Sequence, residues 1–184
     1  NPLKTVRANV NGTLNILDIS KQIKNLKSLV IITSDKCYMN RELKRGYKET
    51  DILGGEDLYS ASKASAELIF KAYANSFFYK ANKYGFATVR AGNVIGGGDW
   101  SKNRIIPDCI RSIEKNKNLV IRNPNSTRPW QHALEPISGY LLLGKKLCLD
   151  KKRFNGPWNF GPSINRTLNV RNVVKLFFEY IGYK

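Results

Sequence analysis

The sequence predicts an α/β fold: a parallel sheet doubly wound by helices, together with a smaller α+β lobe. Three observations carry this prediction. Segments with helical and strand-like spacing alternate through residues 5–92. The strand-like segments are short runs rich in β-branched residues without polar alternation, which is typical of strands buried on both faces. Polar loops follow the carboxyl ends of these runs, where ligands bind in open sheets of this class.

The first predicted elements are a helix, a strand and a long loop. Residues 5–23 place Val6, Val10 and Leu14 at helical spacing and predict an amphipathic helix. Residues 29–34 follow as the first buried strand. Residues 39–57 are polar, contain three glycines and predict a loop. A loop of this length inside a compact domain is more often functional than idle.

A second helix and a second strand follow, and the chain then becomes rich in glycine and polar residues. Residues 60–83 predict a helix and residues 86–90 (FATVR) a strand. From Gly92 the chain continues with the glycine-rich loop GNVIGGGDW and the polar segment NPNSTRPWQH. In this half we expect helices over 104–116, 136–149 and 168–180, and short strands over 119–122 and 158–161.

The formal net charge of +17 comes from 31 basic and 14 acidic residues. Such an excess raises the alternative of a basic nucleic-acid-binding or scaffold protein. The basic residues are scattered, however, and no nucleic-acid-binding motif is present. We therefore interpret the charge as solvated surface whose positive field attracts an anionic substrate, and we expect no specific nucleic-acid partner.

The cysteine content and the hydropathy indicate the compartment. Cys37, Cys109 and Cys148 are odd in number and widely spaced, which argues against a disulfide framework or a zinc site. A reducing cytoplasm is the expected location. No run of eighteen apolar residues exists, so no membrane span is expected. We interpret Cys37 as a small buried hydrophobe and not as a reactive thiol.

Tyr59 and Lys63 lie four residues apart in the motif YSASK. On a helix this spacing places both side chains on one face. A neighbouring ammonium group stabilises the phenolate and lowers the pKa of the tyrosine, which suits it to act as a base near neutral pH. Because such a pair also arises by chance on helix surfaces, the spacing alone is weak support.

The order of the predicted segments supports a functional role for Tyr59 and Lys63. One predicted strand ends in Thr33, Ser34, Asp35 and Lys36, and the next ends in Arg90, Ala91, Gly92 and Asn93. The predicted helix with Tyr59 and Lys63 lies between them. In a parallel sheet the carboxyl ends of the strands meet at one edge, so we expect these groups to converge there.

Six motifs together resemble the extended short-chain dehydrogenase/reductase family, and within it the nucleotide-sugar 4,6-dehydratases that act on CDP-linked sugars. The motifs are TSDKCY, GGEDLYSASKASAE, RAGNVIGGGDW, RIIPD, RNPNSTRPWQH and NFGP. The resemblance extends from Asn9 to about Pro162, and TSDKCY and RAGNVIGGGDW are its most specific parts. It implies a Rossmann-like sheet, NAD as cofactor, a CDP-sugar substrate and a role in deoxysugar and cell-surface polysaccharide biosynthesis.

The resemblance also implies catalytic roles. Tyr59 is the expected base for the sugar 4-hydroxyl, and Lys63 is expected to lower its pKa and to bind the nicotinamide ribose. Ser34 is expected to share the 4-hydroxyl proton, and Asp35 to protonate the departing 6-hydroxyl. Thr33 and Ala91, at the two strand ends, are expected beside the cofactor.

Lys36 departs from the pattern of the related dTDP-sugar enzymes, which have a glutamate there that takes the C5 proton. A lysine can act as that base only if its pKa is lowered; otherwise it stabilises the enolate as a cation while another group moves the proton. The expected contacts to the nucleotide-diphosphate sugar are Asn93, Arg104, Arg122, Arg128 and His132. Arg128 is the strongest candidate for the pyrophosphate, because a guanidinium group binds it through two hydrogen bonds.

The glycine-rich turn and the acidic residue of a dinucleotide-binding motif are absent from this chain. We expect the chain to be an internal part of a longer enzyme, inactive alone. Residues 1–92 would be the C-terminal part of its NAD-binding domain, and residues 93–184 mostly its substrate-binding lobe, with segments that return to the first domain. A homodimer through the helices at 5–23 and 60–83 is expected by analogy. The alternative within the superfamily is another nucleotide-sugar epimerase, dehydratase or decarboxylase.

Overall fold

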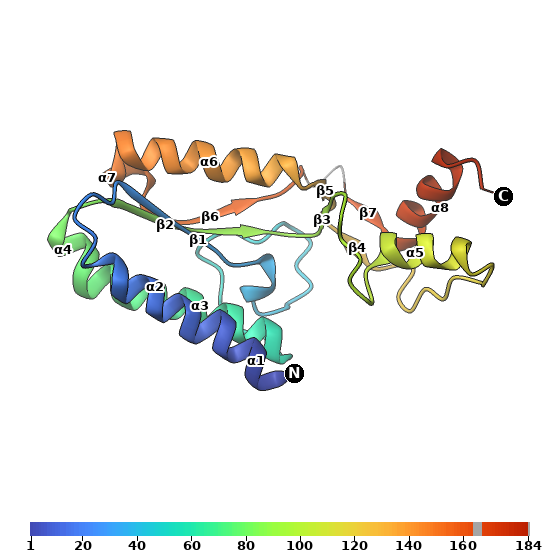
Figure 1. Ribbon diagram of the computed structural model, residues 1–184, viewed down its shortest axis with the longest axis horizontal. Coiled ribbons are helices and arrows are strands. Elements are labelled where there is room, and N and C mark those ends of the chain that lie inside the picture. The colour runs from blue at the N-terminus through green and yellow to red at the C-terminus, as the bar shows by residue number, and fades with distance from the viewer. Residues whose placement is uncertain (164–166, 184) are drawn as a thin grey trace. The chain divides into compact units, whose positions relative to one another are not determined.

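The computed structural model describes residues 1–163 and 167–183 (Figure 1). The chain forms two compact units, which we describe separately. Unit 1 comprises Asn1–Gly92 and Pro136–Phe160. Unit 2 comprises Asn93–Glu135 and the described part of Gly161–Lys184. None of the helices in these residues is long and apolar enough to cross a membrane.

Unit 1 is built on a parallel sheet, as predicted. Its strands are β1 (Ser28–Ile32), β2 (Gly85–Ala91) and β6 (Gly156–Phe160), in the order β1-β2-β6. Ile32 pairs with Val89, and Ala91 pairs with Phe160. The carboxyl ends of β1 and β2 therefore lie side by side.

Helices cover both faces of this sheet, which explains why its strands lack polar alternation (Figure 1). On one face Phe86 packs with Leu17 of α2 (Gly12–Ser20) and Phe70 of α3 (Leu58–Tyr73). On the other face Ala87 and Val89 pack against α6 (Leu134–Leu149). The short helix α7 (Lys151–Phe154) then leads into β6.

The two predicted N-terminal helices are confirmed, but each contains a π-helical turn. The first consists of α1 (Pro2–Val6), η1 (Arg7–Asn11) and α2. The second consists of α3, η3 (Ala74–Phe78) and α4 (Tyr79–Ala81). It ends at Asn82, whose left-handed backbone (φ 46°) stops the helix.

The predicted loop after β1 is confirmed and is tied down at several points. It begins with the 3-10 turn η2 (Asp35–Cys37), and Tyr38 forms an isolated antiparallel bridge with Leu53. Arg45 donates two hydrogen bonds to the carboxylate of Asp51 (2.7 and 2.8 Å). The loop is therefore irregular but held in place.

Unit 2 contains short strands and two helices. The strands are β3 (Val94–Ile95), β4 (Thr127–Arg128), β5 (Gln131–His132) and β7 (Leu168–Asn169), and the helices α5 (Ile105–Glu114) and α8 (Val170–Tyr180) pack together. β3 pairs with β5 in parallel, and β4 pairs with β7 antiparallel.

The strand predicted over residues 119–122 is wrong, because that segment has no strand structure. Val120 is 83% exposed, and among the described residues the neighbouring backbone pairing is made by β4 and β7 instead. A short apolar run becomes a strand only where a partner strand accepts its hydrogen bonds and a layer covers its side chains.

Candidate active site

The first turn of α3 presents Tyr59 at the carboxyl-terminal end of the sheet. Asp57 caps this helix: its carboxylate accepts hydrogen bonds from the backbone N–H of Tyr59 (2.9 Å) and Ser60 (3.0 Å). A hydrogen bond from the Ser60 hydroxyl (2.6 Å), together with these two backbone bonds, lowers the pKa of Asp57. The Tyr59 side chain is exposed at the end of a well-anchored helix.

Lys63 lies one turn further along α3 and reaches the end of β1. Its Nζ donates to the backbone carbonyl of Ile32 (3.4 Å) and lies 5.9 Å from the centre of the Tyr59 ring. Burial lowers the pKa of the Lys63 ammonium, while the negative charge of Glu67 raises it. The predicted pairing of these two side chains on one helix face is thus present in the structure.

The turn after β1 carries Ser34, Asp35 and Lys36 and packs against α3. The Ser34 hydroxyl donates to Asp35 Oδ1 (3.1 Å) and accepts from the backbone N–H of Lys36 (3.2 Å), which closes the turn. Behind it, Cys37 is buried in one cluster with Ala64 of α3. The positive charge of the exposed Lys36 also contributes to the lowered pKa of Asp57. The charge of Lys36 therefore acts on the residue that caps α3.

Asn9 supports the same helix from the other side. Its side-chain amide donates to the Ser62 hydroxyl (3.0 Å), and that hydroxyl donates to the backbone carbonyl of Tyr59 (2.7 Å). The π-helical turn that contains Asn9 is therefore connected, through the Ser62 hydroxyl, to the backbone carbonyl of Tyr59. These two bonds hold Asn9 behind the first turn of α3.

Beneath the turn lies a buried ion pair that the sequence analysis missed. Arg90 of β2 donates to Glu67 of α3 (2.6 Å), and both side chains are 3% exposed or less. The same carboxylate accepts from the hydroxyl of Thr88 (2.9 Å) and from that of Thr33. The Thr33 side chain thus points into the sheet–helix layer, so any contact of this residue with a cofactor would use its backbone.

Arg90 also organises the loop on its other side. It donates to the Tyr38 hydroxyl (2.7 Å) and to the carbonyl of Glu49 (3.1 Å). Tyr38 in turn donates to the Asn159 side chain of β6 (2.7 Å).

One feature of the sequence points to Glu67: it follows Tyr59 and Lys63 at the same four-residue spacing, in a helix segment with many small residues.

The candidate substrate-binding residues lie in unit 2. Asn93 precedes β3, and its carbonyl accepts from the backbone N–H of Gln131 (3.1 Å). Arg128 lies in β4 and is partly buried, and the exposed His132 lies in β5, where its Nδ1 accepts from the Leu134 N–H (3.2 Å). Arg104 is the exposed N-terminal cap residue of α5, and Arg122 is exposed in the segment before β4.

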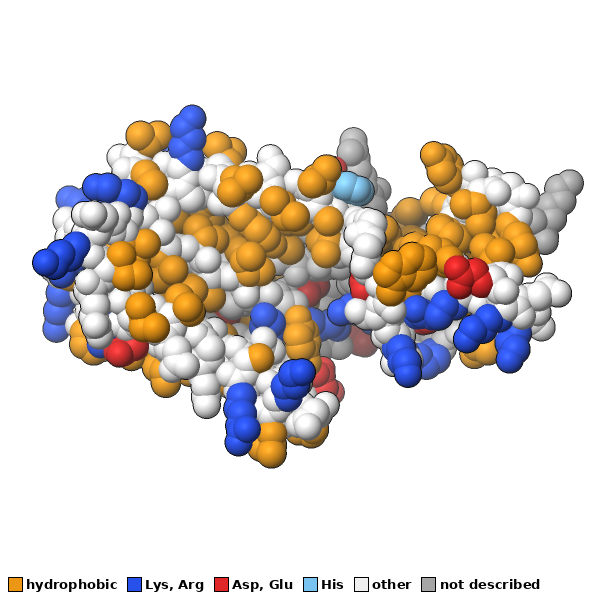
Figure 2. Space-filling view, viewed as in Figure 1, with side chains coloured by type: hydrophobic (Ala, Val, Ile, Leu, Met, Phe, Trp, Pro, Cys, Tyr) orange, Lys and Arg blue, Asp and Glu red, His pale blue; other side chains and the backbone are white. Residues whose placement is uncertain are grey.

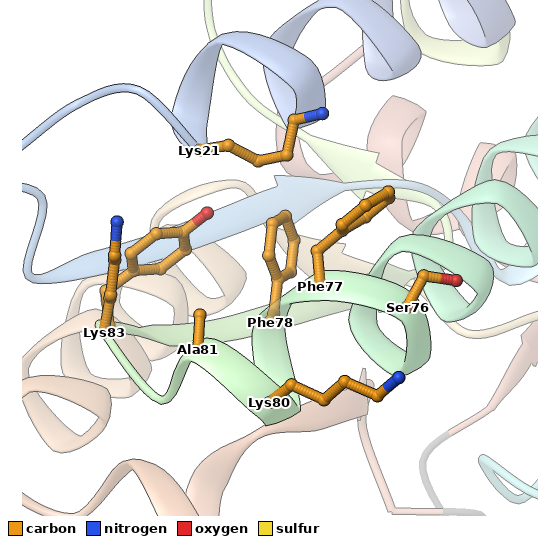
Figure 3. A pocket seen from close by; sticks show the side chains of 8 residues that line it. Lys21, Ser76, Phe77, Phe78, Lys80, Ala81 and Lys83 are labelled. Carbon is orange, nitrogen blue, oxygen red and sulfur yellow. The ribbon is translucent and has the colours of Figure 1, made fainter.

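Two cavities lie in unit 1, away from the exposed Tyr59. One of about 410 Å³ is bordered by Lys21, Phe77 and Tyr84, at the amino-terminal end of β2 (Figure 3). Another of about 540 Å³ lies beside α3, between residues 49–53 and the start of β6. The first lies at the end of β2 opposite to Ala91, so its position does not mark the predicted chemistry.

The groups at the strand ends fit the ribose end of a nicotinamide dinucleotide. A phenol and an ammonium group on one helix face form a donor and acceptor set for two neighbouring hydroxyls. Ala91, the last residue of β2, has a small side chain next to this edge. Tyr59 and Lys63 would therefore hold the ribose, and Ala91 would leave room for the ring.

Curated proteins similar to this chain include nucleotide-sugar 4,6-dehydratases. A curated CDP-glucose 4,6-dehydratase of Salmonella typhimurium is 53% identical over 94% of this chain and 49% of its own length. A dTDP-D-glucose 4,6-dehydratase of Dictyostelium discoideum is 27% identical over 78% of this chain and 34% of its own length. The chain therefore spans about half, or less, of the length of these curated relatives.

Solved structures share the fold. A UDP-N-acetylglucosamine 4-epimerase from Methanobrevibacter ruminantium, in complex with UDP-N-acetylmuramic acid, superposes with a TM-score of 0.81 at 20% identity. It matches all of this chain and 56% of its own. A dTDP-glucose 4,6-dehydratase from Bacillus anthracis, in complex with NAD, gives 0.78 at 23% identity over 97% of this chain and 53% of its own. Residues 1–155 match the model of one family, and the chain belongs to it: the NAD dependent epimerase/dehydratase family.

Proposed function

We propose that the whole protein converts CDP-glucose to CDP-4-keto-6-deoxyglucose, as an NAD-dependent hydro-lyase of deoxysugar and cell-surface polysaccharide biosynthesis. The observation that carries the proposal is the packing of the Ser34–Asp35–Lys36 turn against the helix with Tyr59 and Lys63. The 53% identity to a CDP-glucose 4,6-dehydratase supports the choice of nucleotide and sugar.

The oxidation step needs a base at the sugar 4-hydroxyl. Tyr59, as phenolate, takes this proton, and Ser34 hydrogen-bonds the same oxygen. The Lys63 ammonium stabilises the phenolate electrostatically and binds the ribose of the cofactor. NAD, when bound, supplies the group that accepts the hydride from C4 and returns it to C6.

Loss of water across C5 and C6 needs an acid and a base. Asp35, in its protonated form, gives its proton to the departing 6-hydroxyl. Lys36, exposed in the turn, stabilises as a cation the negative charge that develops at C5, while another group of the whole protein takes the C5 proton. The alternative, in which Lys36 itself takes that proton, requires a lowered pKa, for which burial would be the usual cause.

The remaining contacts are also proposals. Asn93, Arg104, Arg122, Arg128 and His132 bind the nucleotide-diphosphate sugar, with Arg128 on the pyrophosphate. We propose that residues 1–92 belong to the NAD-binding domain and that residues 93–184 supply most of the substrate-binding lobe, with Pro136–Phe160 as a segment that returns to the NAD-binding domain. The whole protein acts in the cytoplasm as a homodimer through the helices α2 and α3.

The deciding experiment incubates the whole protein with CDP-glucose and NAD. A 4-keto-6-deoxy product develops ultraviolet absorbance in alkali, whereas an epimerised sugar does not. Formation of an epimer or a pentose product instead would assign the protein to an epimerase or a decarboxylase of the same family.

The Tyr59→Phe variant tests the assigned base. We expect turnover to fall about 100- to 10,000-fold, the usual contribution of a general base, while CDP-glucose binding measured by calorimetry stays unchanged. Tyr180→Phe is the matched control, because that ring is 93% exposed at the end of α8. Full turnover by Tyr59→Phe would show that another group is the base.

A further inference from the structure

The two ends of the candidate catalytic turn are tied to the same buried ion pair. Thr33, just before Ser34, donates its hydroxyl to Glu67. Tyr38, just after Cys37, accepts from Arg90 (2.7 Å). Glu67 and Arg90 are bonded to each other (2.6 Å). The segment Thr33–Tyr38 is therefore clamped at both ends by one pair of side chains from α3 and β2.

The same pair connects this turn to the candidate base. Glu67 lies on α3 four residues after Lys63 and eight after Tyr59, which is the spacing of one helix face. Arg90 lies one residue before Ala91 at the end of β2. Any movement of the turn relative to Tyr59 must therefore stretch or break the bonds of Glu67 or Arg90.

Stability alone gives a weak reason for such a pair. Removing two charges from water costs about as much as their attraction returns, and well-packed apolar side chains often replace a buried pair without loss. This pair even leaves Arg90 Nε without a hydrogen-bond partner in the described structure. An apolar replacement cannot form directional hydrogen bonds. The ion pair forms them, and thereby fixes the positions of Thr33, Thr88, Tyr38 and the Glu49 carbonyl.

We propose that Glu67 and Arg90 are positioning residues that set the placement of the Ser34–Asp35–Lys36 turn against Tyr59 and Lys63. This inference rests on the proposed function. Neither residue touches the sugar; each acts through Thr33 or Tyr38. Loss of the clamp leaves the fold and the substrate contacts of unit 2 in place, but it allows the acid to drift from the leaving hydroxyl.

The matched pair Thr33→Val and Thr88→Val tests the proposal with the least disturbance. Both hydroxyls donate to Glu67 and both residues are buried, but Thr33 borders the turn and Thr88 lies within β2. In the whole protein we expect Thr33→Val to lower kcat about 10- to 100-fold with an unchanged KM, since small misplacements of reacting groups cost this much. We expect Thr88→Val to keep the native kcat.

Two further measurements separate positioning from a merely structural role. During turnover of Thr33→Val, absorbance of the reduced nicotinamide should accumulate, because loss of water slows more than oxidation does. Without any substrate, hydrogen exchange of the backbone amides of residues 34–38 should be faster in Thr33→Val than in Thr88→Val.

The double variant Glu67→Leu/Arg90→Met removes the pair without leaving one buried charge alone. We expect a melting temperature close to the native one and a kcat about 100-fold lower. A native kcat in this variant and in Thr33→Val, with unchanged exchange of residues 34–38, would overturn the inference. If the native protein itself fails to dehydrate CDP-glucose, the proposed function fails, while the exchange experiment still decides whether the clamp exists.

Discussion

At the residue scale, Lys63 is partly buried and is held by contacts on α3 and β1. Burial lowers its pKa, and Glu67 opposes that shift with its negative charge. The Ile32 carbonyl holds the ammonium group at the end of β1. Lys63 thus lies where the proposed mechanism uses a cation beside Tyr59, in surroundings that do not fully solvate it.

The three cysteines give a test at this scale. Burial raises the pKa of Cys37 to about 12 and that of Cys109 to about 11, whereas Cys148 is exposed on α6. Because the thiolate is the reactive form, an alkylating reagent at about pH 8 should modify Cys148 alone in the native protein. Peptide mass spectrometry measures this, and denatured protein labelled at all three cysteines is the control. Native labelling of Cys37 would contradict its burial beside the turn.

At the element scale, α3 brings the candidate site and the buried pair together. Its first turn presents Tyr59, its second presents Lys63, and Glu67 follows on the side that faces the sheet. Its start depends on Asp57, and its far end passes through the π-helical turn η3 before Asn82 stops it. The helix is thus anchored at the end where the reaction is proposed to occur.

The cap of α3 gives the second prediction. Asp57→Ala removes the acceptor for two backbone N–H groups and should cost about 1 kcal/mol of stability, with lower activity because the first turn frays around Tyr59. Asp57→Asn keeps an acceptor and should stay close to native in urea unfolding.

The lowered pKa of Asp57 also predicts the direction of a pH effect. A carboxyl group whose pKa is lowered by folding stabilises the protein above its ordinary value of 3.8, and this contribution is lost as the pH falls through the folded-state pKa. Asp57→Asn should lose this part of the acid sensitivity. Equal acid sensitivity in both proteins would show that the cap does not contribute.

Helix α6 contains a matched pair of glycines for the third prediction. A Cβ at Gly139 would overlap the ring of Phe160, whereas at Gly144 it would meet nothing nearer than 3.8 Å. Gly139→Ala should therefore destabilise unit 1 by about 1–3 kcal/mol through overpacking. Gly144→Ala should stabilise it by about 0.5–1 kcal/mol, since alanine favours a helix. Unfolding in urea measures both; equal effects would contradict the packing of α6 on β6.

At the scale of the whole molecule, apolar side chains and basic side chains occupy different parts of the surface. Figure 2 shows apolar side chains gathered on the visible face of unit 1, with Lys and Arg placed mostly around them. Ile32 of β1, an end strand of the described sheet, is 59% exposed. Along the sequence the basic residues lie in separate groups, which favours a general attraction of anions over a nucleic-acid surface.

The proposed homodimer gives the prediction at this scale. Leu68 lies on α3 with 56% of its surface exposed, on a helix proposed for the interface. In the whole protein, Leu68→Glu should shift the mass measured by analytical ultracentrifugation from dimer toward monomer, because a charge would have to be buried. Leu141→Glu, on α6 with 72% of its surface exposed and outside the proposed interface, is the control. A dimer unaffected by Leu68→Glu would place the interface elsewhere.

The sequence alone determined the parallel α/β class, the two helix–strand units and the helix that carries Tyr59 and Lys63. These follow from periodicity and from the absence of polar alternation, which are local properties of the chain. The tertiary structure decided three other matters: that residues 119–122 form no strand, that each of the two N-terminal helices contains a π-helical turn, and that Thr33 points toward Glu67. The bonds of Glu67 and Arg90 to each other and to residues 33–38 were also beyond the sequence, because their partners come from three separate segments. Which polar side chains meet inside a protein depends on how sheet and helix layers pack, and no local pattern encodes that.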